Sequence, residues 1–341
     1  MKKKRTVIFI CPSCHQPLIQ QNSAYSCNAC AKKYPIKKGV VCFLHKPDRF
    51  YEETYAGDMS KITFLNQVSL KSILYFYFYK DFYLNAIRKY IHPSDFILDV
   101  GCAGGIKYLA QKGDVVGVDL SLTALKKVIA FYEHAVQADA SKLPFPDETF
   151  DSIVSSYLFE HITVAGKIPL LREWYRVLKP GGRIIFKFDC DNNNPLFRWL
   201  KKTPELYRQQ IIEHDHHYGL LPASSNLNLI KEAGFSVIKY RALNKTPLQY
   251  LPVYDWIGPY AHKSAMVAFA HRMGALLDKS KLLWVPYNAL INWFDSIVEK
   301  FFPLDYARIL FVVGEKPANS AYRKKISRNP NAETSYISTN A

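Results

Sequence analysis

Apolar and polar residues alternate along the centre of the chain in a way that predicts strands and helices in turn. Short apolar runs with the length of buried strands stand at 96–100, 115–120, 135–139, 150–156 and 183–189. Between them, apolar residues at helical spacing occupy 105–113, 122–133 and 169–182, the last closed by a pair of glycines. This alternation predicts a doubly wound, mostly parallel α/β sheet with helices on both faces. Ligands of such sheets bind at the carboxyl ends of the strands.

Two further apolar runs extend the predicted sheet. Residues 235–243 and 307–317 predict a sixth and a last strand, so we expect a seven-stranded sheet. Between them, residues from about 247 to 305 carry apolar side chains at helical spacing, with Trp and Tyr interleaved. This segment predicts a helical insertion of two or three helices. We expect it to pack together or to cover an apolar substrate, although such helices also lie in membrane interfaces.

The rest of the chain divides into three segments. Short alternating runs predict a small β module over residues 1–46. Residues 47–92 form a lead-in that is dense in aromatic residues from 74 to 91, and the main domain covers 93–317. The tail, 318–341, is rich in Asn, Ser, Thr and Lys, which is typical of disordered segments.

The net charge of +16 belongs mostly to the ends of the chain. Residues 1–46 hold nine Lys and Arg and no acid, and residues 318–341 hold four basic residues and one acid. The centre therefore carries only +4. Basic arms favour anionic partners such as RNA or lipid headgroups. The alternative interpretation is that these ends only keep the protein in solution.

The sequence predicts no membrane-spanning segment. No run reaches the roughly 18 uninterrupted apolar residues that a span needs. The apolar run behind the basic opening is too short for a secretion signal. We therefore expect a cytoplasmic protein, with peripheral contact at an anionic membrane as an addition that the basic ends allow. In the cytoplasm, paired cysteines favour a metal site over disulfides.

Two Cys-x-x-Cys pairs stand near the start of the chain. Cys11 and Cys14 form the first pair, and Cys27 and Cys30 form the second. Each pair fits a tight turn that directs two thiolates to one point, so two facing turns make a tetrahedral four-sulfur zinc site. We predict structural Zn²⁺ in a zinc ribbon. The remaining cysteines have no partner in spacing and are expected in the core.

The segment "FICPSCHQPLIQQ…YSCNACAKKYPIKKGVVCFL" resembles a family of small zinc-ribbon proteins that activate tRNA and protein methyltransferases as separate subunits. The Tyr34-Pro35-Ile36 stretch and Gly39 follow the family pattern, and Val41 replaces its last proline. The resemblance covers about 35 residues of this chain. Such ribbons also occur fused to methyltransferases, so the resemblance implies a methyltransferase context more than a substrate.

The stretch "LDVGCAGG", 98–105, forms a glycine-rich turn after the first predicted strand. Three glycines in five positions indicate that something comes close to the backbone. A dinucleotide site needs Gly-x-Gly-x-x-Gly, and here Gly101, Ala103 and Ile106 miss its last position. An acid before the first glycine also repels phosphate. S-adenosylmethionine fits better, because its ammonium and sulfonium are attracted to Asp99.

Acids at the ends of the next two strands complete this pattern. Asp119 ends the second strand, where its carboxylate can accept both ribose hydroxyls. Asp139 follows the third strand and can accept from the adenine amino group, with Leu120 and Ala140 as apolar walls. We therefore predict an S-adenosylmethionine site at this edge of the sheet.

These residues resemble the class I S-adenosylmethionine-dependent methyltransferases. "ILDVGCAGG", "GVDLS", "QADASKLPFPDETFD", "SSYLFEHI" and "LLREWYRVLKPGGRIIFK" follow in the family order over about 93–240. The resemblance implies a Rossmann-like fold. Ala103 departs from the family's middle glycine. The cofactor-binding residues it implies are Asp99, Gly101, Cys102, Ala103, Gly105, Asp119, Leu120, Asp139, Ala140 and Ser156.

Two groups of residues are candidates for catalysis at the acceptor. In the family, "YLFEH" borders the methionine end of the cofactor, so His161 is a candidate base with Glu160 and Tyr157 beside it. In some relatives Glu-x-x-Glu-His holds a metal, but Tyr157 takes the first of those positions and argues against one here. The second group, "EHDHHYG", offers His216 as a base or clamp. A structural role is the alternative for both groups.

The sequence is compatible with three functions. We favour methyl transfer to a small-molecule acceptor or to a lipid- or glycan-linked one, because the centre of the chain lacks a basic surplus and is rich in aromatics. The second is an RNA methyltransferase whose basic ribbon grips phosphates; the layout also resembles ribosomal RNA guanine methyltransferases. The third is a non-catalytic activator that only binds the cofactor. The sequence does not identify the acceptor atom.

Overall fold

The computed structural model describes residues 5–44, 46, 48–54, 82–246, 248, 255–278 and 281–318. Residues 319–341 of the predicted tail and the aromatic stretch 74–81 lie outside the described residues. The fold that follows is that of the described part of the chain.

Eleven strands form one mixed sheet in the order β1-β2-β3-β4-β7-β6-β5-β8-β9-β11-β10. Their bounds are β1 Ile19–Gln21, β2 Ala24–Ser26, β3 Lys33–Lys37, β4 Val40–Cys42, β5 Phe96–Val100, β6 Asp114–Asp119, β7 His134–Gln137, β8 Phe150–Ser156, β9 Leu178–Asp189, β10 Ser236–Leu243 and β11 Ile309–Glu315. The run from β4 to β9 in this order is parallel throughout. The predicted α/β sheet, mostly parallel in its main domain, is confirmed.

The sheet is longer than the seven strands predicted. Seven strands come from the main domain, but β4 of the N-terminal module pairs in parallel with β7, from Val40 opposite Ala135 to Cys42 opposite Gln137. Strands β1 to β3 continue the sheet outward in antiparallel fashion. The sequence did not predict that the strands of the N-terminal module join the sheet of the main domain. Nothing in the spacing of residues 33–42 indicates that one of these strands pairs with another sheet.

Helices cover both faces of the sheet. One face packs against α3 (Phe82–Tyr90), α4 (Lys107–Lys112) and α5 (Leu122–Val128). The other packs against α6 (Val164–Val177) and α9 (Ala223–Glu232). The predicted glycine stop of α6 is wrong, because the helix ends at Val177 and the Leu178–Gly182 stretch opens β9.

The N-terminal module shares the main core instead of folding around its own. Phe9 lies 5.8 Å from the ring of Phe145 and 5.6 Å from that of Phe43, measured between ring centroids. Arg5 crosses the amino ends of the central strands, where it pairs with Asp151 at 3.2 Å and donates to the Ser94 carbonyl. Burial of these aromatic rings joins the module to the sheet.

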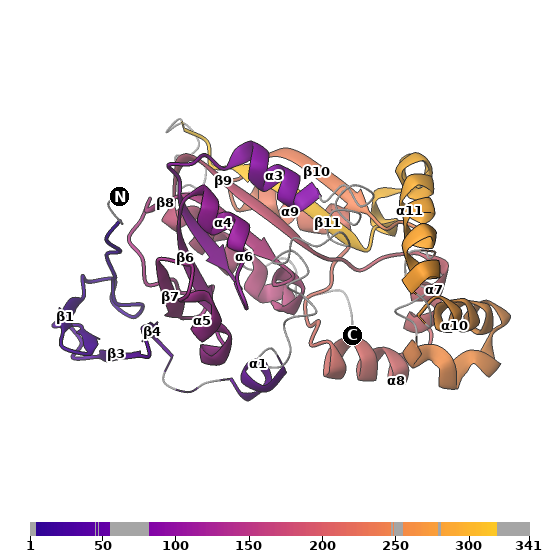
Figure 1. The fold of residues 1–341 in the computed structure, drawn as a ribbon, viewed down its shortest axis with the longest axis horizontal. Coiled ribbons are helices and arrows are strands. Elements are labelled where there is room, and N and C mark those ends of the chain that lie inside the picture. The colour runs from indigo at the N-terminus through magenta and orange to yellow at the C-terminus, as the bar shows by residue number, and fades with distance from the viewer. Residues whose placement is uncertain are drawn as a thin grey trace.

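The segment between β10 and β11 is helical. It holds η6 (Asp255–Lys263), α10 (Ala265–Asp278), α11 (Lys281–Val298), η7 (Glu299–Phe301) and η8 (Leu304–Tyr306). Small clusters join it to α7 (Pro195–Lys201), α8 (Pro204–Tyr207) and the π-helical turn η4 (Arg208–His214). Figure 1 shows these helices at the end of the molecule opposite β1 and β3.

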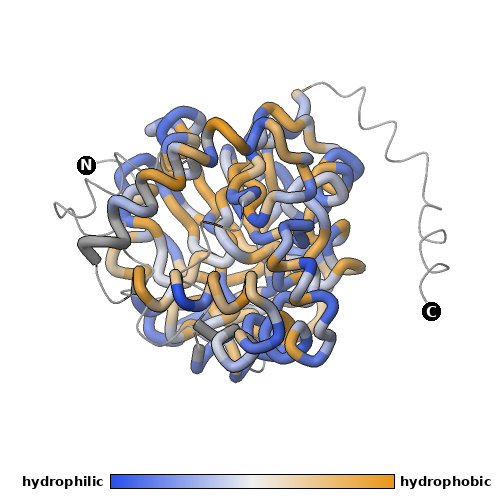
Figure 2. The backbone as a smooth tube through the Cα atoms, turned by 90° about the vertical axis from the view of Figure 1, so that its right-hand side faces the viewer, coloured by the Kyte–Doolittle hydropathy of each residue, from blue (hydrophilic) through white to orange (hydrophobic). Residues whose placement is uncertain are grey.

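The outer side of this insertion carries apolar side chains. Figure 2, which faces the right-hand side of Figure 1, shows hydrophobic and hydrophilic stretches interleaved along its helices. Trp293 is 62% exposed and Phe301 is 83% exposed. Within the described residues, none of the helices combines the length and the apolar character that a membrane crossing demands.

Candidate cofactor and acceptor site

The loop between β5 and α4 is left-handed at three positions: Gly101 at φ +66°, Ala103 at +43° and Gly105 at +72°. A Cβ at Gly105 would approach Val128 to 2.6 Å, and one at Gly101 would approach Leu158 to 3.2 Å. The close approach expected at these glycines is therefore made, at least in part, by the protein's own side chains. Glycine is needed here for both backbone conformation and packing.

Asp119, at the end of β6, holds this loop in place. Its two carboxylate oxygens accept hydrogen bonds from the backbone N–H groups of Ala103 and Ser121, each at 2.8 Å. Each oxygen keeps further lone pairs, so the carboxylate can still accept from a ligand hydroxyl. The structure thus brings the predicted loop and Asp119 together.

Asp99 lies behind the loop and is 3% exposed. The Tyr132 hydroxyl donates to it at 2.6 Å and in turn accepts from the Ile106 N–H. Burial raises the pKa of Asp99 to about 7, although the bond from Tyr132 opposes that rise and the nearby carboxylate of Asp119 adds to it. A buried acid of this kind is stabilised in its ionised form by a cationic ligand.

A third carboxylate, Glu52, comes from α1 (Arg49–Thr54). It accepts from the N–H groups of Leu122 and Thr123 at 2.6 and 3.1 Å and so caps α5. Its neighbours on α1 reach the other half of the site: the Phe50 ring stacks on His216, and the Tyr51 ring meets His161 edge-on. Helix α1 therefore connects the loop side of the site with the histidines.

The remaining predicted cofactor residues lie along the same edge of the sheet. Asp139 is engaged by Ser141, whose N–H and hydroxyl both donate to Oδ1. Leu120 and Ala140 are half-buried beside it, and Ser156 ends β8. The Cys102 side chain, by contrast, is buried in the core under Gly117, so only its backbone faces the loop.

The acceptor side begins at Tyr157, directly after β8. Its φ of +57° is a strained backbone conformation for a bulky residue, and strain of this kind gathers at functional sites. The ring is 43% exposed, and the Lys187 ammonium lies 5.0 Å from its centre. Tyr157 therefore turns toward Lys187 at the surface.

Glu160 and His161 follow on the short helix η3 (Phe159–His161). Glu160 is 1% exposed, and burial together with the carboxylate of Asp189 raises its pKa to about 8. Burial lowers the pKa of His161 to about 4 and also lowers the pKa of His217, whose ring centroid is 5.0 Å away. Both imidazoles are thus neutral near pH 7 and can accept a proton.

His216 lies beside this pair in the loop after η4. Its carbonyl accepts from Nδ1 of His161 at 3.1 Å, and its own Nδ1 is 2.9 Å from the Tyr218 hydroxyl. The two candidate groups of the sequence, 55 residues apart, therefore form one cluster.

Sequence reasoning missed several residues of this site. Glu52, Phe50 and Tyr51 stand in a segment predicted only as a lead-in, and nothing in their spacing points to α5 or to the histidines. Tyr132 was part of a predicted helix, although α5 ends at Val128. Asp189 had one available signal: it ends a buried strand next to β8, which Tyr157 directly follows.

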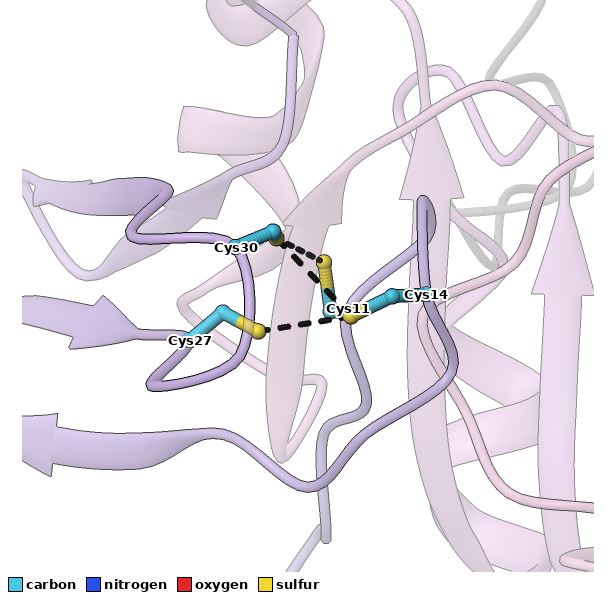
Figure 3. A group of neighbouring side chains, drawn as sticks. All are labelled: Cys11, Cys14, Cys27 and Cys30. Atoms are coloured by element: carbon cyan, nitrogen blue, oxygen red, sulfur yellow. Dashed lines mark hydrogen bonds between the residues drawn. The ribbon is translucent and has the colours of Figure 1, made fainter.

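The four N-terminal cysteines converge from two loops, as Figure 3 shows. The sulfurs of Cys11 and Cys30 are 3.5 Å apart, and those of Cys14 and Cys27 are 3.4 Å apart. A zinc ion with four Zn–S bonds of about 2.3 Å holds its sulfurs about 3.8 Å apart, so the donor set fits that ion. The Tyr34 hydroxyl lies 3.2 Å from the sulfur of Cys11.

Comparison with protein families matches residues 98–186 to the methyltransferase domain family. Phosphoethanolamine N-methyltransferase 3 of Arabidopsis thaliana is 37% identical over 113 residues, which cover 29% of this chain and 22% of that protein. The ubiquinone/menaquinone biosynthesis C-methyltransferase UbiE of Vibrio campbellii is 30% identical over 175 residues, 43% of this chain and 67% of that protein.

Among solved structures, phosphoethanolamine N-methyltransferase 2 of Haemonchus contortus is similar to this chain. It is 19% identical with a TM-score of 0.46, and the match covers 84% of this chain and 62% of that one. The chain spans less than a third of the length of the first curated relatives it matches, both of them phosphoethanolamine N-methyltransferases of Arabidopsis thaliana.

Proposed function

The chain belongs to the class I S-adenosylmethionine-dependent methyltransferases, and on that premise we propose that it methylates a small-molecule acceptor or a lipid- or glycan-linked one. The cofactor would supply a methyl group that is already activated on sulfur. The observation that carries the proposal is the glycine-rich loop that Asp119 holds in place. Asp99, Asp119 and Glu52 place three carboxylates around this loop, and none of the loop contacts given for the site comes from a basic side chain. This charge suits a cationic cofactor and repels a dinucleotide.

In this proposal each residue has a separate task. Asp99 would face the cationic end of the cofactor, and Asp119 would accept from its ribose hydroxyls. Asp139, Leu120 and Ala140 would border the adenine. Holding the acceptor at attack distance is the larger part of such catalysis, and Phe50, Tyr51 and Tyr157 offer apolar surface for it. A base is needed only where the acceptor must lose a proton, and His161, which burial keeps neutral, or His216 would serve.

The preference for a small or lipid-linked acceptor rests on two features. The central residues 47–317 carry only +4 of the net charge. The aromatic rings next to the histidines suit an apolar or planar acceptor better than a phosphate backbone. The printed names of the relatives, phosphoethanolamine and ubiquinone/menaquinone methyltransferases, point the same way.

A structural zinc ion in the four-thiol cluster is part of the proposal. It would hold the two loops of the N-terminal module together and leave no open position for chemistry. We also propose a cytoplasmic location with peripheral contact at a membrane through the exposed apolar residues of the insertion, among them Trp293 and Phe301. Sedimentation with phosphatidylglycerol vesicles tests that contact, and Trp293→Ser with Phe301→Ser should abolish it.

An RNA methyltransferase is the second candidate. Lys33 and Lys37 on β3 and Lys38 after it are exposed on one small module, which is a compact set of phosphate contacts. Binding to RNA through this set would weaken steeply with salt.

Methyl transfer from radiolabelled cofactor into a lysate of the host lacking this gene separates these functions. We expect label in the lipid or the small-molecule fraction, and none with Asp119→Ala. Label in RNA alone would overturn the first proposal in favour of the second. A protein that binds the cofactor but labels no fraction would be a non-catalytic activator.

A further inference from the structure

A second set of metal-ligand side chains lies beside the candidate acceptor position. Glu160, His161 and His217 each offer one ligand atom, and these atoms all lie within 4.8 Å of one another. The sequence argued against a metal here, because Tyr157 replaces the first residue of the Glu-x-x-Glu-His pattern. The structure supplies a different third ligand, His217, from a loop more than fifty residues later.

Two carboxyl oxygens buried in this region, Oε2 of Glu160 and Oδ1 of Asp189, lack a hydrogen-bond partner among the described residues. The charge of Asp189 acts on Glu160, His161 and His217. Glu160 is 1% exposed and Asp189 is 6% exposed. A buried polar oxygen without a partner is unfavourable, and a cationic ligand at this point would satisfy it and favour the ionised form of Glu160.

The neighbouring cations hydrogen-bond to other groups, although the charge of Lys167 still acts on the Glu160 carboxyl. The Lys167 ammonium donates to the Phe159 carbonyl and lies over the Phe159 ring. Arg308 donates to Oδ2 of Asp189, the other oxygen of that carboxylate. Neither group forms an ion pair with Glu160 within the part of the chain that the structure describes.

The hydrogen bond of His161 fixes the tautomer that a metal requires. Its Nδ1 donates to the carbonyl of His216 at 3.1 Å, which leaves the lone pair of the neutral ring on Nε2. Metal-bound histidines commonly hold a backbone carbonyl in this way. The same loop therefore supplies one ligand, His217, and orients another.

From this geometry we propose that Glu160, His161 and His217 bind a divalent first-row transition-metal cation such as Zn²⁺, with Asp189 as a neighbouring carboxylate. Two imidazoles and one carboxylate are typical of sites that keep an open coordination position. The ion would hold an acceptor oxygen there, which makes His161 a ligand and not a base. That role rests on the proposed function, whereas the binding of the ion does not.

Cobalt(II) tests the site, because thiolate ligands give it intense charge-transfer bands and nitrogen and oxygen ligands do not. The full chain is dialysed against Co²⁺, and its total metal content and visible spectrum are measured. We expect two ions per chain, one in the cysteine cluster and one that adds only weak visible bands. Glu160→Gln and His217→Ala should each weaken the second ion by more than about 100-fold and leave the first unchanged.

His214→Ala is the matched control, because this histidine stands in the same loop, pairs with Asp215 and is exposed. It should retain both ions. A wild-type chain with one ion only, or a second ion that survives both Glu160→Gln and His217→Ala, would overturn the proposal. If Glu160→Gln does not fold, the half-exposed His217 decides the question. Methyl transfer is not measured, so a wrong acceptor assignment leaves this result intact.

Discussion

The four-thiol cluster and the carboxylate–histidine cluster are two metal-capable sites of one chain that are built in opposite ways. The first site takes its ligands from two Cys-x-x-Cys pairs, and its sulfurs lie on loops of the N-terminal module. The second takes Glu160 and His161 from the short helix η3 that follows β8, and His217 from a distant loop. Local spacing fixes the first site, and the topology of the sheet fixes the second.

This difference predicts how each site depends on its ligand. The loops of the thiol cluster hold four sulfurs close together, so the proposed ion would be part of the fold there. The carboxylate–histidine cluster is assembled by the fold of the sheet and its loops before any ligand binds. Loss of the ion should therefore destabilise the first region and leave the second standing.

The largest effect should come from Cys27→Ser. We expect this variant to lose its zinc and its melting temperature to fall by more than about 5 °C, because structural zinc sites supply about 10 kcal/mol or more. Because β4 pairs with β7, amide exchange should also become faster in β7 and not only in residues 5–44. Ser13→Ala, beside the cluster, should retain zinc. Zinc at full occupancy in Cys27→Ser would contradict the assignment.

Asp119→Ala should have the next largest effect, on binding and not on folding. Two hydrogen bonds from ribose hydroxyls to a carboxylate contribute about 3 kcal/mol together, so affinity for S-adenosylmethionine should fall about 100-fold. Calorimetric titration measures the affinity, and circular dichroism checks the fold. Asp114→Ala, at the other end of the same strand, should bind normally. Unchanged affinity in Asp119→Ala would remove it from the cofactor site.

The sequence predicts features that depend on neighbouring residues, and it does not predict those that depend on distant contacts. The alternating pattern predicted β5 to β11 and the loop at Gly101, because each depends on neighbours in the chain. It also predicted which acids end the strands. It could not predict that β4 would pair with β7, since two short buried strands carry no record of their partner.

The acceptor side shows the limit most clearly. His161 and His216 could be named as candidates, but their contact depends on the path of residues 190–215. Glu52 could not be found at all, because a single acid on a six-residue helix has no local signature. The glycines predicted a close approach by a ligand, and the side chains of Leu158 and Val128 occupy part of that space.

A smaller effect should appear in the pH dependence of cofactor binding. Burial raises the pKa of Asp99 to about 7, so the unliganded protein keeps this proton above the usual carboxyl pKa of about 3.9. The folded state binds more protons than the unfolded state in that window, so this group makes unfolding easier as pH rises through it. A cationic ligand favours the carboxylate, so binding releases the proton and affinity should rise up to about tenfold per pH unit below 7.

Calorimetric titrations at pH 5.5, 6.0, 6.5 and 7.0 measure that slope. Asp99→Asn cannot ionise, so its affinity should be lower and should lose the part of the slope that Asp99 contributes. An equal slope in the wild-type chain and in Asp99→Asn would assign the titration to another group.

The smallest effect should come from Ala103→Gly, which probes strain in the loop between β5 and α4. Ala103 is left-handed at φ +43°, a conformation that disfavours L-residues by roughly 1–2 kcal/mol. Glycine removes this strain but gains freedom in the unfolded chain worth about 0.5–1 kcal/mol. The free energy of unfolding should therefore rise slightly, by about 0.5 kcal/mol, as measured by urea denaturation.

Ala110→Gly on α4 is the matched control, because the same change inside a right-handed helix should lower the free energy of unfolding by about 1 kcal/mol. Opposite signs for the two variants would mean that the loop is held against its own backbone preference by Asp119, before any cofactor binds. Equal destabilisation would mean that Ala103 carries no strain in solution. The loop would then take its shape from the cofactor, as the thiol loops take theirs from zinc, and the contrast between the two regions would fail.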